Sequence, residues 1–74
     1  MEKILFILNQ IRPEFDFASS SDFLADGMLD SFDVVALVAA LDSTFGISID
    51  GTEIVPENFQ NLAALRLLLE RHGI

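Results

Sequence analysis

Residues 26–45 read DGMLDSFD followed by VVALVAALDSTF, and Gly46 closes the segment. Asp30 is a natural N-cap, because its carboxylate can accept hydrogen bonds from the unpaired N–H groups of a first helical turn. The apolar residues behind it recur at helical spacing, as a stripe of Val34, Val38, Leu41 and Phe45 that Val35 and Leu37 widen. Gly46 suits the position after the last turn. The pattern predicts a helix over about residues 31–45, with Ser31 in its first turn.

Ser31 is the candidate for chemistry in this segment. A hydroxyl at the start of a helix is exposed, and the unpaired N–H groups beside it favour a bound phosphate. Activation as a nucleophile needs a nearby base, but the only histidine is His72 and no lysine follows Lys3. We therefore expect no enzymatic activity, and a hydrolase is the least expected class. Ser31 is expected to be a residue that another enzyme modifies. The alternative is an ordinary serine at a helix start.

Residues 2–11 show a second helical pattern. Ile4, Leu8 and Ile11 follow the i, i+4, i+7 spacing, which Leu5 widens and from which Phe6 and Ile7 depart. A β-strand is the alternative for the short apolar run 4–8. The polar residues around the run favour a helix, and Pro13 ends it nearby.

Residues 13–29 read as a loop pinned over the core by Phe15, Phe17, Phe23 and Leu24. Residues 52–55 suggest one short helical turn before Pro56, with Phe59 as an anchor. Asn61 caps a last helix whose core residues are Leu62, Leu65, Leu68 and Leu69. Arg71 and an exposed His72 lie at its negative end, and Gly73 closes it.

These elements predict an all-α fold, a small four-helix bundle of antiparallel type with three main helices and one short helix. Its 74 residues fit one domain, 1–74. Cysteine is absent, so neither a disulfide framework nor a thiolate metal site can form.

Charge narrows the classes of partner. Twelve acidic residues against four lysines and arginines give a net charge of −8, which argues against nucleic acid and against anionic membrane surfaces. It suits basic protein partners, although acidity can also serve solubility alone. No stretch reaches the roughly 20 apolar residues of a membrane span, and residues 4–8 are too short for a signal peptide. A cytoplasmic protein is expected.

The aspartates of the loop and of the helix start are the remaining candidates for metal ligands. Asp22, Asp26, Asp30 and Asp33 lack the spacing and the closing glutamate of a calcium loop. A solvated acidic face is expected in place of a metal site.

The quoted residues resemble the acyl carrier and peptidyl carrier proteins. The family signature is Asp-Ser-Leu at the start of the second helix of a four-helix bundle, matched here by Asp30-Ser31-Phe32, with Phe45-Gly46-Ile47 matching the end of that helix. The resemblance covers roughly residues 24–69 in matching order and spacing.

The resemblance implies an acyl carrier protein, which carries acyl or aminoacyl intermediates between enzymes of a biosynthetic pathway. Ser31 would carry a covalent 4′-phosphopantetheine arm, transferred from coenzyme A by a phosphopantetheinyl transferase, and Asp30 would assist that transferase. Cargo would travel as a thioester on the arm, since the chain has no thiol of its own. Further partners would be an acyl- or aminoacyl-loading enzyme and a downstream acyltransferase or synthase. The chain itself would be a monomer.

Three departures from the family pattern indicate which kind of carrier this chain resembles most. Phe32 replaces the usual leucine or methionine, Ala36 and Ser43 replace acidic residues, and residues 54–59 differ from fatty-acid-synthesis carriers. The chain is closer to stand-alone aminoacyl carriers, a D-alanyl carrier for envelope polymers being the alternative. The expected partner surface consists of Leu29, Phe32, Asp33 and Val55, although Phe32 and Val55 equally suit the edge of the core. A helical interaction module that is never modified is the alternative from another class.

Overall fold

The structure is a computed structural model that describes residues 2–74. The α-helices are α1 (Glu2–Ile11), α2 (Ser31–Phe45), α3 (Pro56–Phe59) and α4 (Leu62–Arg71). Two 3₁₀ turns, η1 (Phe17–Ser19) and η2 (Gly51–Glu53), lie in the connections. The described residues form no β-strand, so the predicted small all-helical bundle is confirmed and the strand alternative for residues 4–8 is excluded.

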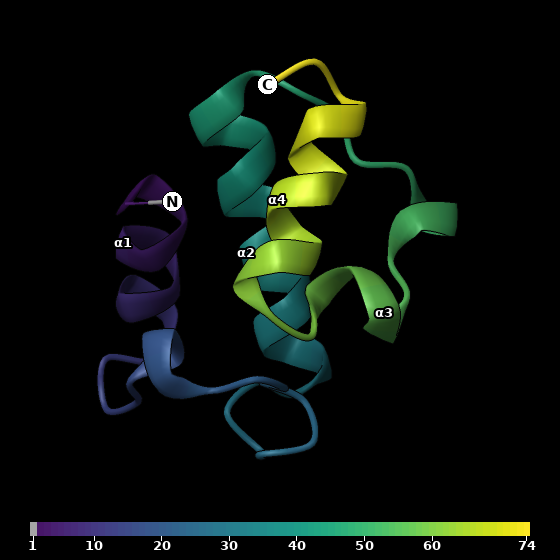
Figure 1. The fold of residues 1–74 in the computed structure, drawn as a ribbon. Helices are drawn as coiled ribbons and strands as arrows, with labels where there is room; N and C mark the ends of the chain where they lie inside the picture. Colours follow the sequence, from purple (N-terminus) through teal and green to yellow (C-terminus); the bar gives the residue numbers. More distant parts are fainter. Residues whose placement is uncertain (1) are drawn as a thin grey trace.

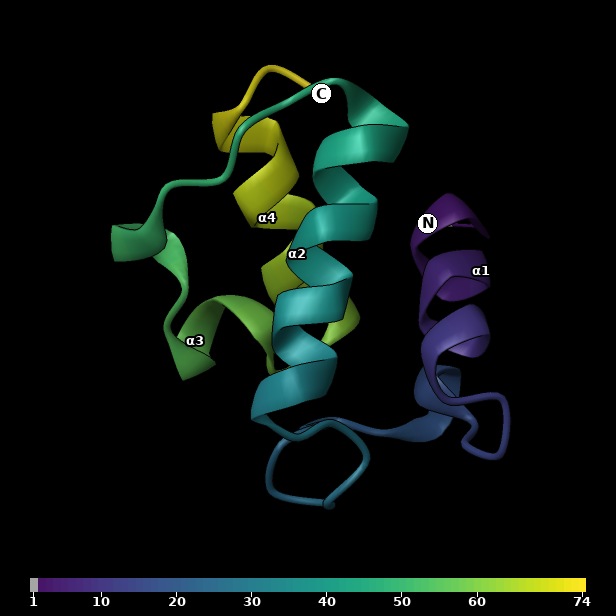
Figure 2. The same ribbon diagram turned by 180° about the vertical axis from the view of Figure 1, so that it is seen from behind.

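The long helices do not all alternate in direction (Figures 1 and 2). α1 runs opposite to α2, but α4 runs in the same direction as α2, because the connection through η2 and α3 returns the chain to the end at which α2 began. The predicted antiparallel arrangement therefore holds for α1 against both α2 and α4, whereas α2 and α4 are parallel to each other. Residues 12–30 cross beneath the bundle between α1 and α2.

One apolar core joins the helices and this connection. The residues buried deepest are Leu8, Phe17, Phe23, Leu37, Leu41, Phe59, Leu65 and Leu68. The rings of Phe17 and Phe23 pack edge to face with centroids 5.1 Å apart. The prediction that phenylalanines pin the loop over the core is confirmed for these two rings.

Two helical positions differ from the predicted stripes. Ile7 is buried, because it lies three residues after Ile4 and therefore shares its helix face. Val35, expected to widen the buried stripe of α2, is 64% exposed. The buried face of α2 is narrow and centres on Leu37 and Leu41.

The helix ends follow the predicted caps. Asn61 Oδ1 accepts from the Ala64 N–H at 2.8 Å at the start of α4. Gly46 closes α2 with a φ of 67°, a left-handed conformation that glycine adopts without strain.

The predicted short helical turn before Pro56 is present, shifted slightly, as the 3₁₀ turn η2. The short helix α3, which begins at Pro56, was not predicted. Proline favours the first helical position and restricts the residue before it to extended backbone, and Val55 has a φ of −127° and a ψ of 152°.

No helix within residues 2–74 is both long enough and apolar enough to cross a membrane.

Candidate functional site

Ser31 is the first residue of α2, and its side chain is exposed. Two reciprocal hydrogen bonds fix this helix start. The Asp33 N–H donates to Asp30 Oδ1 at 2.9 Å, and the Asp30 N–H donates to Asp33 Oδ2 at 3.1 Å. Such a capping box satisfies donors that the first turn would otherwise leave unpaired. Ser31 thereby lies between two fixed residues, and it is itself exposed.

Arg12, just beyond the end of α1, binds the same two carboxylates. Its Nε donates to Asp33 Oδ2 at 2.8 Å, and one terminal nitrogen donates to Asp30 Oδ2 at 3.4 Å. Its other terminal nitrogen reaches Glu14 Oε2 at 3.4 Å. One guanidinium therefore contacts three carboxylates close to Ser31.

These contacts change the acidity of Asp33. Partial burial raises the pKa of its carboxyl, but the hydrogen bond from the Asp30 amide and the ion pair with Arg12 outweigh that effect. The pKa of Asp33 therefore lies below its ordinary value, and the carboxylate stays ionised at neutral pH.

A groove of about 490 Å³ opens beside Ser31. One wall comes from α2 and the residues before it, and the other from the segment between η2 and α3. The lining residues are Leu24, Leu29, Asp30, Ser31, Val34, Val35, Ile54, Val55, Pro56 and Phe59. Eight of these ten are apolar, so the groove can take up an apolar group attached near the serine.

Large exposed apolar side chains lie on the two segments that form this groove, and three of them, Val35, Ile54 and Val55, line it. Phe32 is 86% exposed, and Val35, Ile54 and Val55 are also exposed. We call these four residues the apolar rim. Exposed apolar clusters of this kind commonly mark contact sites for other molecules.

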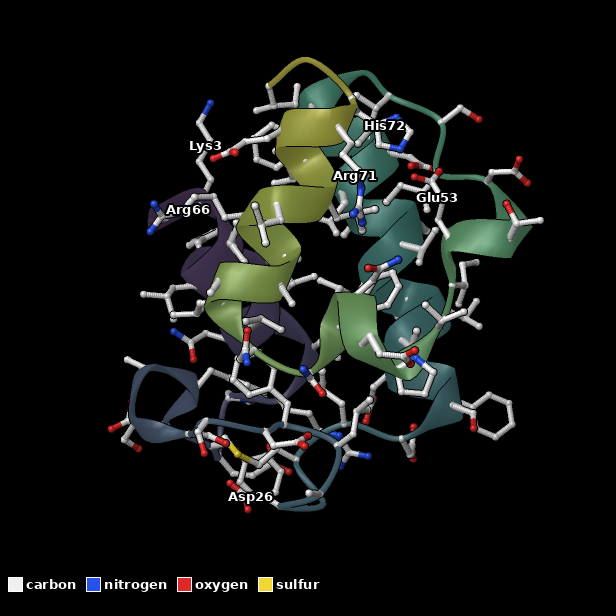
Figure 3. All side chains as sticks on the ribbon, turned by 45° about the vertical axis from the view of Figure 1, so that its right-hand side comes forward. Lys3, Asp26, Glu53, Arg66, Arg71 and His72 are labelled. Atoms are coloured by element: carbon white, nitrogen blue, oxygen red, sulfur yellow. The ribbon has the colours of Figure 1, made fainter. Side chains whose placement is uncertain are left out.

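The second wall is fastened to the end of α4 by polar contacts (Figure 3). His72 Nε2 lies 3.0 Å from both carboxylate oxygens of Glu53, and Arg71 donates to Asn58 Oδ1 at 3.0 Å. Asn58 Nδ2 in turn donates to the Glu53 carbonyl at 2.7 Å. The hydrogen bond from the Asp50 amide lowers the pKa of Glu53; partial burial opposes this, and His72 adds to it.

His72 is half-buried in this network, so the prediction of an exposed terminal histidine was wrong. Glu53 lies nineteen positions earlier in the chain. Sequence spacing carries no signal of that contact, since it depends on how the η2–α3 connection folds back.

The structure brings most of the predicted site residues together. Ser31, Asp30 and Val55 line the groove, and Asp33 completes the capping box. Phe32 follows Ser31 in α2 and is exposed, but it does not line the groove. Leu29 is buried and contributes to the groove from the core side. It can therefore contact a group inside the groove more readily than a protein docked outside it.

Sequence reasoning missed Arg12, Val35 and Ile54. Arg12 could have been noticed as the only basic residue between Lys3 and Arg66 in an acidic chain. Val35 and Ile54 gave no such signal, because exposed and buried valines or isoleucines look alike in sequence.

Among residues 2–74 no group of three or more histidine, aspartate or glutamate side chains is arranged to hold a metal ion. Comparison of the chain with protein-family models, with curated proteins and with solved structures gave no match.

Proposed function

We propose that this chain is a carrier protein of the acyl carrier type, which holds acyl or aminoacyl groups on a 4′-phosphopantetheine arm attached to Ser31. The observation that carries the proposal is an exposed serine at the first position of α2 that lines an apolar groove. The sequence signature around Ser31 and at residues 45–47 supports the same function.

The helix start suits a phosphodiester on Ser31. The first-turn N–H groups and the helix dipole favour a negative group at this end, and the Arg12 guanidinium lies nearby. Ser31 is exposed, so the active site of another enzyme can reach it.

The groove suits what the arm carries. Its volume of about 490 Å³ lies within the usual range for small-molecule sites, and its lining is mainly apolar. A short acyl chain or an apolar amino-acid side chain attached through a flexible arm could fold back into it and be shielded from water.

Attachment would use chemistry that the partner enzyme supplies. The Ser31 hydroxyl oxygen forms a bond to the phosphorus that bears the pantetheine of coenzyme A, the pyrophosphate bond breaks, and adenosine 3′,5′-bisphosphate leaves. The serine proton passes to a base of the transferase. The terminal thiol of the arm supplies the sulfur for thioester formation, which this cysteine-free chain lacks.

The test is intact mass spectrometry after incubation with coenzyme A, Mg²⁺ and a phosphopantetheinyl transferase of broad specificity. We expect one phosphopantetheine adduct on the wild-type chain and none on Ser31→Ala. Ser43→Ala is a matched control, since it removes another exposed serine of α2 and should be modified like the wild type.

Circular dichroism should show that Ser31→Ala keeps its helices. A wild-type chain that stays unmodified would contradict the proposal and favour an unmodified interaction module, for which the apolar rim provides a surface. An adduct that persists on Ser31→Ala would move the attachment site elsewhere.

The pathway is a separate question that loading assays can address. Adenylating enzymes specific for D-alanine, for other amino acids and for fatty acids can each be offered the modified chain. The departures from fatty-acid-synthesis carriers at Phe32, Ala36 and Ser43 lead us to expect aminoacyl loading.

A further inference from the structure

Arg12 is held at the junction between α1 and the start of α2. Its backbone N–H donates to the Leu8 carbonyl at 2.9 Å, so it continues the hydrogen bonding of α1 before Pro13 turns the chain away. From this fixed backbone its side chain reaches Asp30 and Asp33, which lie eighteen and twenty-one positions later. The contact bridges the whole loop that leads to Ser31.

The guanidinium restrains both members of the capping box. Asp33 Oδ2 accepts from Arg12 Nε at 2.8 Å and from the Asp30 amide at 3.1 Å, so its position is set from two directions. The Asp33 side chain is only 13% exposed, which limits competition from water. The planar fork of arginine suits several acceptors at once, whereas lysine offers a single charged point.

Arg12 also offsets the negative charge next to Ser31. Three carboxylates lie within 3.4 Å of its guanidinium nitrogens, and coenzyme A brings further negative charge to the serine. Within the described residues the other cations lie elsewhere: Lys3 is over the Phe45 ring, Arg71 binds Asn58, and Arg66 lines a separate hollow on α4. Arg12 is therefore the cation placed to reduce repulsion at this site.

We propose that Arg12 is a positioning residue for the modification of Ser31, acting through Asp33 and Asp30 to present the serine to the transferase. The inference rests on the proposed function and adds to it a residue from α1, outside the Asp-Ser signature. Loss of the guanidinium would free the two carboxylates, loosen the start of α2 and leave uncompensated charge where a phosphate has to approach.

The experiment is a double-mutant cycle on the rate of modification, measured as kcat/KM for the carrier at fixed coenzyme A and Mg²⁺. The variants are Arg12→Gln, Asp33→Asn and the two combined. Because Arg12 acts through Asp33, we expect each single change to slow modification about tenfold and the combination to be no slower than either. Independent effects would multiply to about a hundredfold.

Arg66→Gln is the control for net charge, since it removes the same charge from α4 and should stay within about twofold of the wild type. Arg12→Lys keeps the charge but loses the fork, and we expect an intermediate rate. Each variant is assayed at a temperature at which circular dichroism shows it fully folded. Should Arg12→Gln fail to fold, Arg12→Lys decides the matter alone.

Suppose that the wild type is modified and that Arg12→Gln or Arg12→Lys is modified at the same rate. That result would overturn the role of Arg12 and leave the carrier function intact. A double variant restored to the wild-type rate would show that only charge balance matters, and a hundredfold loss would show independent effects; either result overturns positioning through Asp33. A wild-type chain that takes no adduct overturns both this inference and the proposed function.

Discussion

Asp30 uses its two carboxylate oxygens for different contacts. Oδ1 accepts from the Asp33 amide in the capping box, while Oδ2 faces a terminal nitrogen of Arg12. The first contact belongs to the helix and the second ties the helix to α1. Because both depend on one side chain, the start of α2 should be sensitive to its removal.

Replacement of this cap should lower stability measurably. For Asp30→Ala we expect a loss of about 1 kcal/mol, the usual effect of removing an N-cap side chain, and a thermal midpoint lower by about 4–8 °C. Asp16→Ala is the control, since Asp16 precedes η1 without a side-chain capping bond. Equal midpoints for the two variants in thermal unfolding would show that the Asp30 carboxylate does not cap α2.

The lowered pKa of Asp33 predicts a pH dependence. A carboxyl whose pKa is lower in the folded state contributes stability above its unfolded pKa of about 3.9, and that stability is lost as the pH falls through the folded pKa. We therefore expect the wild type to be more stable than Asp33→Asn at pH 6, with a difference that shrinks as the pH falls below about 4. Thermal unfolding of both proteins across this range measures it, and a constant difference down to pH 2 would argue against the ionised contact.

At the scale of elements, the connection between α1 and α2 behaves as part of the core. Phe17 is 1% exposed and packs edge to face on Phe23, whose N–H donates to the Gln60 carbonyl at 2.6 Å. The connection is thus joined to the α3–α4 turn as well as to the helices. Its end is the capping box, so its packing also fixes the position of Ser31.

Truncation of the Phe17 side chain should therefore lower the stability of the whole fold strongly. Phe17→Ala removes a fully buried aromatic side chain, for which a loss of about 3–5 kcal/mol is usual. Phe6→Ala is the matched control, because Phe6 is 65% exposed on α1 and should change stability by no more than about 0.5 kcal/mol. Urea unfolding of the two variants compares them directly, and similar midpoints would mean that the connection contributes little to the core.

The elements that were predicted correctly from the sequence are those whose ends are marked by local capping residues. Asp30, Asn61 and Gly46 mark helix ends through contacts within a few residues, so the bounds of α2 and α4 followed from the sequence. The position of α3 was missed, although Pro56 at a first helical position was a usable local signal.

The parts of the candidate site that were missed depend on long-range contacts. Arg12 reaches Asp33 across the loop, and His72 reaches Glu53 across the whole of α3 and α4. Nothing in the spacing of these residues reports the path of the chain between them. Ser31 was found because its environment is local, whereas the groove beside it was not, since its two walls come from distant segments.

At the scale of the whole molecule, repulsion between like charges opposes folding. The net charge is −8, and the described chain measures 28 × 22 × 20 Å. At 0.01 M salt the screening length is about 30 Å, so carboxylates repel one another across the entire molecule. At 0.15 M it falls to about 8 Å, and only near neighbours still interact.

Salt should consequently stabilise this protein, although it weakens the ion pairs of Arg12. We expect the thermal midpoint to rise by several degrees between 0.01 M and 0.15 M NaCl, because twelve acidic residues face only four lysines and arginines. Asp16→Asn removes one exposed charge that makes no capping bond, so it should raise the midpoint slightly at low salt and reduce the gain from added salt. A wild-type midpoint that falls as salt is added would mean that the ion pairs around Arg12 outweigh the overall repulsion. Stability would then depend on the same contacts that fix the start of α2.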